Sequence, residues 1–187
     1  MIPTIIEQGT HKEYAYDIFS HLLNNRIIFL SGEINDITAN LVISELLYLD
    51  SLSSEEISLY INSPGGSVTS GLAIFDTINF IKSDVRTICI GLAASMAAIL
   101  LASGTKGKRN ALTNSEIMIH QPLGGVEGQA SEIKIVADHI EKTKTKLNKL
   151  LSKLTNQKYE KVVNDTDRDY YLSSQDAKKY GIIDTIL

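Results

Sequence analysis

"ISLYINSPGGSVTSGLAIFDTINFIKSDVRTICIG", residues 57–91, decides the fold class of this chain. Its first apolar run predicts a strand over 57–62, which ends in the turn 63–67. Apolar residues at helical spacing predict a helix over 69–82, and a second strand is expected over 85–91. Short strands that alternate with helices are typical of an α/β domain, in which crossover connections join the strands of one sheet.

The same alternation continues outward from this unit in both directions. Upstream we expect a helix whose apolar residues run from Tyr14 to Leu23, a strand over 26–31, and a helix over 36–51 with Asp36 as its N-cap. Downstream we expect a helix from about Ser95 to Ser103, a strand over 115–120, a short helix capped by Ser173, and a final strand over 182–187.

A long helix is expected over 131–155, after a glycine-rich stretch over 121–130. One side of this helix is apolar and the other carries many Lys and Glu residues, which is typical of a solvated face. At 1.5 Å per residue it spans about 37 Å, which is more than a compact domain of this size requires. Its apolar stripe either covers the core or projects toward a second subunit.

Composition limits the classes of function. The chain has 187 residues, 43% of them hydrophobic, and a net charge of −4, so we expect a single domain with one core and no nucleic-acid or anionic-membrane partner. The single cysteine, Cys89, cannot form an internal disulfide, which fits a reducing compartment. No secretory signal begins the chain and no apolar run is long enough to cross a bilayer, so we expect a cytoplasmic protein.

Metal and phosphate chemistry find no support in the sequence. The four histidines, His11, His21, His120 and His139, do not occur at metal-ligand spacing, and no CxxC or HExxH motif is present. The turn 63–67 lacks the residues of a phosphate-binding loop. We therefore expect neither a metal nor another cofactor.

Nucleophilic catalysis remains, with Ser95 as the candidate nucleophile. This serine stands where a strand is expected to pass into a helix, so unpaired N–H groups lie nearby, although an ordinary N-cap serine fits the local sequence as well. His120 ends a strand and can point into a cleft or be a core histidine. Among Asp165, Asp167 and Asp169 we choose Asp169 as its partner, because its neighbours suggest the most buried surroundings. The Gly65–Gly66 pair can turn a peptide N–H toward a ligand.

Taken together, these stretches resemble the proteolytic subunit of the Clp protease. The similarity rests on segments that cover nearly the whole chain in order: "IPTIIE" (2–7), "AYDIFSHLL" (15–23), "ISLYINSPGGSVTSGLAIFDTI" (57–78), "TICIGLAASMAA" (87–98), "IMIHQPLGG" (117–125), "GQASEI" (128–133) and "DTDRDYYLSSQDAKKYGIID" (165–184). The resemblance implies the α/β fold of the Clp and crotonase families, with repeated ββα-type units and a projecting handle of a strand and a long helix over 121–155.

The resemblance also implies a catalytic mechanism. Ser95 matches the nucleophile, His120 the general base and Asp169 the carboxylate that orients the imidazole, while the backbone N–H groups of Gly66 and Met96 match the donors to the oxyanion. The implied activity is a serine endopeptidase that needs no cofactor.

Assembly and partners follow from the same resemblance. The family forms two stacked seven-membered rings, and an AAA+ ATPase unfoldase docked on the rings supplies unfolded polypeptide. Residues 1–16 match the axial loops, Arg168 a residue that links the site to contacts between rings, and Tyr60 and Phe80 positions at which the ATPase docks. The strand along which the substrate lies matches Gln121, Pro122, Leu123, Gly124 and Gly125.

The chain departs from the family at a few positions. Ala97 and Ala98 stand where glycine is common, and their methyl groups are expected to narrow the specificity pocket. Asn110 and Thr113 replace a frequent aromatic residue and a proline. Two other functions remain to be weighed: a non-catalytic or weakly active ring partner of a paralogous subunit, and an acyl-CoA hydratase or isomerase of the crotonase type, which would not need a Ser-His pair.

Overall fold

The computed structural model describes residues 3–8 and 13–187. Within them the strands are β1 (Thr4–Gln8), β2 (Glu13–Asp17), β3 (Ile27–Ser31), β4 (Ile57–Ser63), β5 (Val85–Ala94), β6 (Arg109–Ala111), β7 (Glu116–Ile119), β8 (Tyr170–Ser173) and β9 (Thr185–Ile186). The helices are α1 (Ile18–Asn24), α2 (Asp36–Leu52), α3 (Val68–Phe80), α4 (Met96–Ala102), α5 (Ala130–Thr155), α6 (Tyr159–Asp165) and α7 (Ser174–Tyr180).

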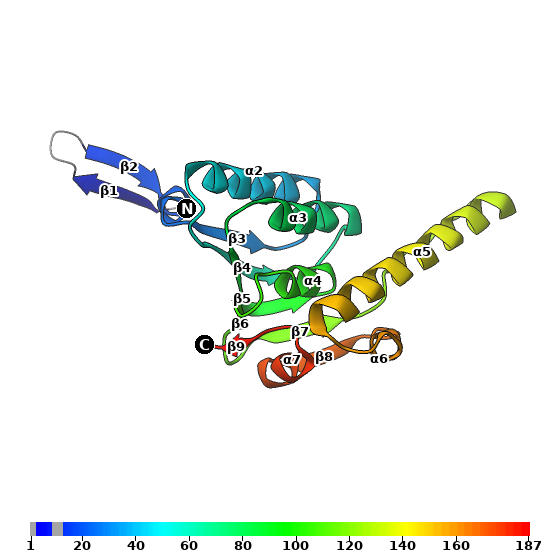
Figure 1. The fold of residues 1–187 in the computed structure, drawn as a ribbon. Coiled ribbons are helices and arrows are strands. Elements are labelled where there is room, and N and C mark those ends of the chain that lie inside the picture. Colours follow the sequence, from blue (N-terminus) through cyan, green and yellow to red (C-terminus); the bar gives the residue numbers. More distant parts are fainter. Residues whose placement is uncertain (1–2, 9–12) are drawn as a thin grey trace.

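The central sheet is mostly parallel and confirms the α/β class. Its strands run in the order β3-β4-β5-β6-β9 with parallel pairing, β7 joins β5 in parallel, and β8 pairs antiparallel with β7. The helices α2 and α3 lie together over one side of β3 and β4, and the antiparallel hairpin of β1 and β2 extends away from the sheet (Figure 1). The mostly parallel sheet and its covering helices agree with the expected Clp/crotonase-like fold.

Strand β5 is long because its first and last parts pair with different strands. Its first part pairs with β6 at Thr87–Cys89, and its last three residues pair with β7 at Leu92–Ala94. Between the two parts lies Gly91, whose φ of 85° few other residues adopt, and a side chain there would meet Asn62 Oδ1 at 3.0 Å. The turn at Gly91 therefore carries the end of β5 away from β6 and alongside β7.

Apolar side chains from both faces of the sheet form one core. Leu46 of α2, Leu59 of β4, Ile74 of α3 and Leu100 of α4 are all fully buried in it. Burying a side chain of this size stabilises the fold by roughly 1.5–3 kcal/mol relative to leaving it exposed. The small residues around Ser95 are part of this core, since Ala97 and Ala98 have no exposed surface.

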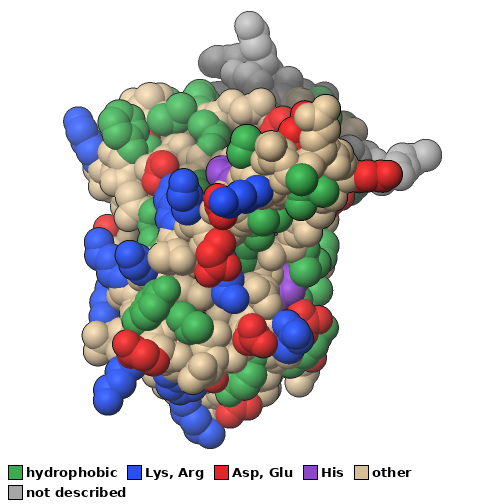
Figure 2. Space-filling view, turned by 90° about the vertical axis from the view of Figure 1, so that its right-hand side faces the viewer, with side chains coloured by type: hydrophobic (Ala, Val, Ile, Leu, Met, Phe, Trp, Pro, Cys, Tyr) green, Lys and Arg blue, Asp and Glu red, His purple; other side chains and the backbone are tan. Residues whose placement is uncertain are grey.

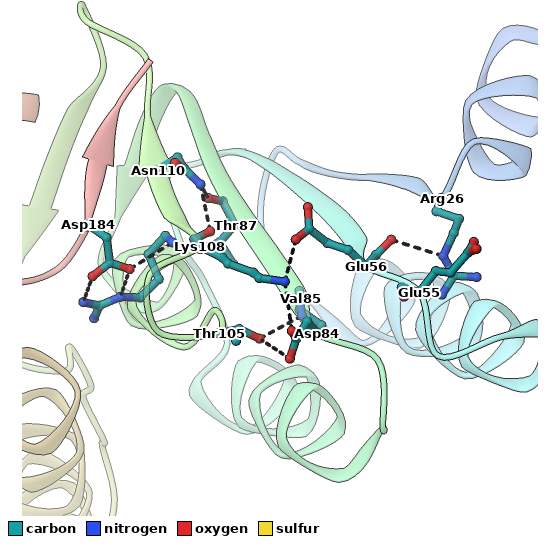
Figure 3. Close-up of polar contacts among 11 residues, drawn as sticks. Arg26, Glu55, Glu56, Asp84, Val85, Thr87, Thr105, Lys108, Asn110 and Asp184 are labelled. Atoms are coloured by element: carbon teal, nitrogen blue, oxygen red, sulfur yellow. Dashed lines mark hydrogen bonds and ion pairs between the residues drawn. The ribbon is translucent and has the colours of Figure 1, made fainter.

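Polar contacts tie the ends of the strands together. Lys108 bridges the carboxylates of Glu56 and Asp84 at 2.8 Å and 2.9 Å (Figure 3). Arg109, which is 4% exposed, donates to both carboxylate oxygens of Asp184 at 2.9 Å and 2.6 Å. Burial by itself would raise the pKa of Asp184, but the hydrogen bonds and the charge of Arg109 hold that pKa below its ordinary value. This pair anchors the C-terminal segment to β6.

Some boundaries differ from the sequence-based expectations. Asn35, and not Asp36, caps α2: its Oδ1 accepts hydrogen bonds from the N–H groups of Ile37 and Thr38, while Asp36 accepts one from the hydroxyl of Ser70. Tyr14 belongs to β2, so the first helix begins only at Ile18. The short elements β6, α6 and β8 were not expected, because three to seven residues carry little periodic signal.

Helix α5 both covers the core and projects from it. Its buried residues, Leu147, Asn148, Leu151 and Thr155, all lie in its C-terminal half, and the other half extends away from the domain (Figure 1). Hydrophobic side chains lie among charged ones on the face toward which α5 projects (Figure 2). The expected strand of the handle is not formed over 121–129, where no neighbouring strand of the described chain pairs with it.

Among the described helices, none is long and apolar enough to cross a membrane.

Candidate active site

Ser95 occupies a strained position between β5 and α4. Its φ of 55° and ψ of −122° lie outside the regions that non-glycine residues favour, which costs on the order of 1–3 kcal/mol. It precedes the first helical residue, yet its side chain makes no capping hydrogen bond. The hydroxyl instead donates to His120 Nε2 at 2.8 Å. The alternative of an ordinary N-cap serine is therefore wrong.

The pairing of β5 with β7 brings His120 to Ser95. Ala94 lies opposite Met118 in the parallel register, and the N–H of Ser95 donates to the carbonyl of Met118 at 2.8 Å. His120 follows β7 directly, so its ring reaches the hydroxyl across the ends of the two strands. The imidazole side chain is 13% exposed and lies at a cavity, so it is not an enclosed core histidine.

The antiparallel pairing of β7 with β8 brings in Asp169. Ile119 lies opposite Tyr170 in this register. Because the strands run in opposite directions, His120, which follows Ile119, lies opposite Asp169, which precedes Tyr170. His120 Nδ1 donates to Asp169 Oδ1 at 2.9 Å. The expectation of buried surroundings is wrong, because the Asp169 side chain is 56% exposed in the single chain. Asp165 lies elsewhere, hydrogen-bonded to the hydroxyl of Tyr180.

The Gly65–Gly66 turn packs against Ser95, and Met96 follows Ser95 in the chain. Gly65 and Gly66 have φ values of 90° and 148°, and a Cβ on Gly65 would lie 2.8 Å from Ser95 Cβ and 3.0 Å from Met96 N. The loop is held by backbone hydrogen bonds from Ile34 to Gly65 and from Ser67 to Ile34. Within the described residues, the N–H groups of Gly66 and Met96 donate to no other backbone atom. Both are therefore candidates to donate to an oxygen bound at Ser95.

Two cavities open on either side of His120. The first is small, about 20 Å³, and is lined by Val68, Ser95, Met96, Ile99, Ile119, His120, Pro122, Leu147, Asn148, Leu151 and Thr166. The second, about 190 Å³, lies between residues 120–124 and 167–169, with Ile140 of α5. Ala97 and Ala98 line neither cavity, so their methyl groups do not narrow the space beside Ser95. Asn148 and Thr166 were not predicted, because Asn148 is one of many polar residues on a long helix and Thr166 lies in a run of polar residues.

Of the remaining predicted residues, Pro122 lines the small cavity with Ser95, and the following ones do not line it. Arg168 is exposed and donates to the carbonyl of Asp167, and Leu123 is 85% exposed in the segment 121–125. Tyr60 stacks on Phe29 at 5.4 Å between ring centroids. Phe80 is 80% exposed beside a shallow cavity. Of residues 1–16, the part at 1–2 and 9–12, which includes His11, lies outside the described residues.

Two departures from the family pattern have structural roles. The buried side chain of Asn110 donates to the carbonyl of Lys108 at 2.8 Å, and Thr113 Oγ1 donates to the carbonyl of Leu187 at 3.2 Å.

Burial raises the pKa of the Cys89 thiol to about 11, so it is protonated at neutral pH. Across residues 3–8 and 13–187, no three His, Cys, Asp or Glu side chains come together as metal ligands.

A hydroxyl, an imidazole and a carboxylate joined in this order can deprotonate the hydroxyl as it attacks an electrophile. Free backbone N–H groups beside the hydroxyl can stabilise the negative charge that forms on the attacked group. Comparison with family models gives an independent result, because the Clp protease model matches residues 10–187, which is nearly the entire chain. The match and the fold agree, and the chain therefore belongs to the Clp protease family of peptidases.

Proposed function

We propose that this protein is a serine endopeptidase, the proteolytic subunit of an ATP-dependent protease complex that cleaves unfolded polypeptides. The observation that carries the proposal is the hydrogen-bonded chain from Ser95 through His120 to Asp169, with a strained Ser95 at its head. A strain of this kind persists only where the surrounding structure maintains it, and it is common at catalytic nucleophiles.

The reaction proceeds by acyl transfer. Ser95 Oγ attacks the peptide carbonyl carbon while His120 Nε2 takes the hydroxyl proton, and the Gly66 and Met96 N–H groups bind the carbonyl oxygen as it becomes negative. His120 then gives the proton to the leaving amine, and the peptide bond breaks. Water, activated by the same imidazole, releases the acyl group. Asp169 keeps the proton on Nδ1 and stabilises the imidazolium without accepting that proton.

The segment 121–125 is proposed to bind the substrate backbone. It follows His120 directly and borders the larger cavity, and within the described chain it pairs with no strand. An extended peptide can add to such a segment through main-chain hydrogen bonds, with its side chains pointing alternately toward and away from the protein. Such binding requires an extended chain, so an unfolded polypeptide is the expected substrate.

Oligomerisation into two stacked seven-membered rings is supported by uncovered apolar residues. On α2, Ile37, Leu41, Tyr48 and Leu52 are all at least half exposed, and Ile133 and Ile135 lie uncovered on the projecting half of α5. Exposed apolar surface of this extent marks interaction sites in soluble proteins. We propose that 121–155 is the handle joining the rings and that the unpaired segment 121–129 forms its strand on assembly.

Other family roles are part of the same proposal. Arg168, next to Asp169 in the chain, would link the site to contacts between rings. An AAA+ ATPase would dock near Tyr60 and Phe80, and residues 1–16 would form the axial loops. The rings would contain this chain alone or also a paralogous subunit, in a cytoplasmic complex.

The alternative is a non-catalytic or weakly active ring partner. Such a subunit is free to lose Ser95, His120 or Asp169, and the intact hydrogen-bonded set speaks against it. The hydratase or isomerase alternative is disfavoured by the same set, since that chemistry uses paired carboxylates and no serine nucleophile.

The test is the Ser95→Ala variant. Hydrolysis of a short fluorogenic peptide should fall by about 10⁶-fold, as in other serine triads, while native mass is unchanged. Ser103→Ala is the matched control, since Ser103 lies at the other end of α4 and its hydroxyl bonds only the carbonyl of Leu100. Equal turnover by the two variants, or a fluorophosphonate label on another residue, would refute the mechanism.

A further inference from the structure

The small cavity beside Ser95 and His120 has a mostly apolar lining, into which Asn148 and Thr166 bring polar groups. Met96, Ile99, Leu147 and Leu151 contribute apolar side chains, and no Lys, Arg, Asp or Glu takes part. Its volume of about 20 Å³ is enough to centre one water molecule, so it accepts a slim side chain more readily than a branched or aromatic one. Because Ser95 and His120 border the cavity, a peptide attacked at Ser95 places the side chain before the scissile bond, P1, at its entrance.

Asn148 of α5 is the only amide side chain in this lining, and it is 4% exposed. Its Oδ1 accepts a hydrogen bond from Thr166 Oγ1 at 3.0 Å, and no described residue bonds its Nδ2. Every fully enclosed side-chain N or O atom of the described residues does have a hydrogen-bond partner. The Nδ2 group must therefore be open to the cavity that Asn148 lines.

Thr166 holds this amide and connects it to the segment proposed to bind substrate. The carbonyl of Thr166 accepts a hydrogen bond from the N–H of Gln121 at 2.6 Å. The Thr166 hydroxyl has one proton and two acceptors, the carbonyl of Val162 at 2.8 Å and Asn148 Oδ1 at 3.0 Å. When the proton goes to Val162, the Asn148 amide can turn over, so that its NH₂ donates to Thr166 and its carbonyl faces the cavity. Asn148 can thus offer a donor or an acceptor.

We propose that Asn148 determines specificity by hydrogen-bonding the side-chain amide of a glutamine at P1. Glutamine has an unbranched apolar stem that suits the walls and a neutral amide that matches Asn148 in either orientation. A charged P1 side chain would lose its hydration without finding an opposite charge, which disfavours it. This inference rests on the proposed peptidase function and assigns that same site a preference.

The experiment compares two fluorogenic peptides that differ only in having glutamine or leucine at P1. The wild-type protein should cleave the glutamine peptide with a kcat/KM within about tenfold of that for leucine. In Asn148→Leu, a change of similar shape, the glutamine-to-leucine ratio should fall about tenfold or more, since an amide left unpaired in the cavity costs roughly 1–3 kcal/mol. Thr166→Val, which removes the hydroxyl that holds the amide, should lower the ratio by less.

Fluorophosphonate labelling of Ser95 reports whether each variant has a folded site. If Asn148→Leu does not label, the glutamine-to-leucine ratio of kcat/KM is measured for Asn148→Ala instead. A variant that labels but keeps the wild-type glutamine-to-leucine ratio overturns the assignment of Asn148 and leaves the peptidase function standing. A glutamine-to-leucine ratio below about one tenth in the wild-type protein has the same consequence. A wild-type protein that neither labels nor cleaves either peptide overturns both.

Discussion

Replacing Gly65 by alanine should disable the site while leaving its three side chains in place. A Cβ at Gly65 would lie 2.6 Å from the Ala94 carbonyl oxygen and 2.8 Å from Ser95 Cβ. Atoms of this kind rest at roughly 3.5 Å, so the loop must withdraw by about 0.8 Å. That movement carries the neighbouring Gly66 N–H away from the attacked oxygen.

The expected loss follows from this displacement. A misplacement near 1 Å, or the removal of one oxyanion donor, lowers kcat by about 10²-fold or more. The positive φ of Gly65 adds a backbone penalty of roughly 1–2 kcal/mol to the free energy of folding. Gly32→Ala is the matched control, because Gly32 also has a positive φ, 77°, but a Cβ there meets no atom within 4 Å.

The assay is kcat for a fluorogenic peptide together with urea unfolding of both variants. Both should lose stability through the backbone penalty, whereas only Gly65→Ala should lose about a hundredfold in kcat. If Gly65→Ala retains a kcat within about threefold of Gly32→Ala, the Gly65–Gly66 loop does not supply the oxyanion donor.

Three further predictions concern other groups. Asp169→Asn should lower kcat by about 10⁴-fold without changing native mass, because the amide no longer holds the required tautomer of the His120 ring; a loss below tenfold would contradict this role. Asp184→Asn should destabilise the fold by roughly 3–5 kcal/mol at pH 7, since it leaves Arg109 buried without its anion. Because the folded-state pKa of Asp184 is lowered, the wild-type protein has its full excess in free energy of unfolding over Asp184→Asn above about pH 4. This excess disappears as the pH falls through the lowered pKa, and urea unfolding at several pH values measures it. Cys89 should resist iodoacetamide at pH 8, where a thiol with a pKa of about 11 is only about 0.1% ionised; rapid alkylation of the native protein, followed by mass spectrometry, would count against its burial.

Much of the fold was predictable because its longer elements carry their own periodicity. The strands β3, β4, β5 and β7 and the helices α2, α3 and α5 appear close to the expected positions. At the start of α2 the expectation failed. Asp36 was expected to cap the helix, but its carboxylate accepts a hydrogen bond from the distant Ser70, and the adjacent Asn35 is the cap.

The candidate site was harder to predict, because local sequence left two alternatives open for each residue: Ser95 as an N-cap or a nucleophile, and His120 as a core or a cleft residue. Family resemblance pointed to both, and the geometry now excludes the N-cap role. The choice of Asp169 agrees with the hydrogen bond to His120, but its reason, burial, was wrong. Nothing in the local sequence distinguished Asn148 from any other polar residue on a long helix.

Local sequence was sufficient to locate the longer strands and helices, the small residues around Ser95, and the paired glycines that allow positive φ values. These properties depend on residues close together in the chain. The contacts of the site instead depend on the fold, which brings Ser95 to His120, 25 residues away, and His120 to Asp169 after a further 49. The register between β5, β7 and β8 makes both contacts. A strand's hydrophobic pattern selects which of its faces is buried, but no single segment specifies which distant strand pairs with it.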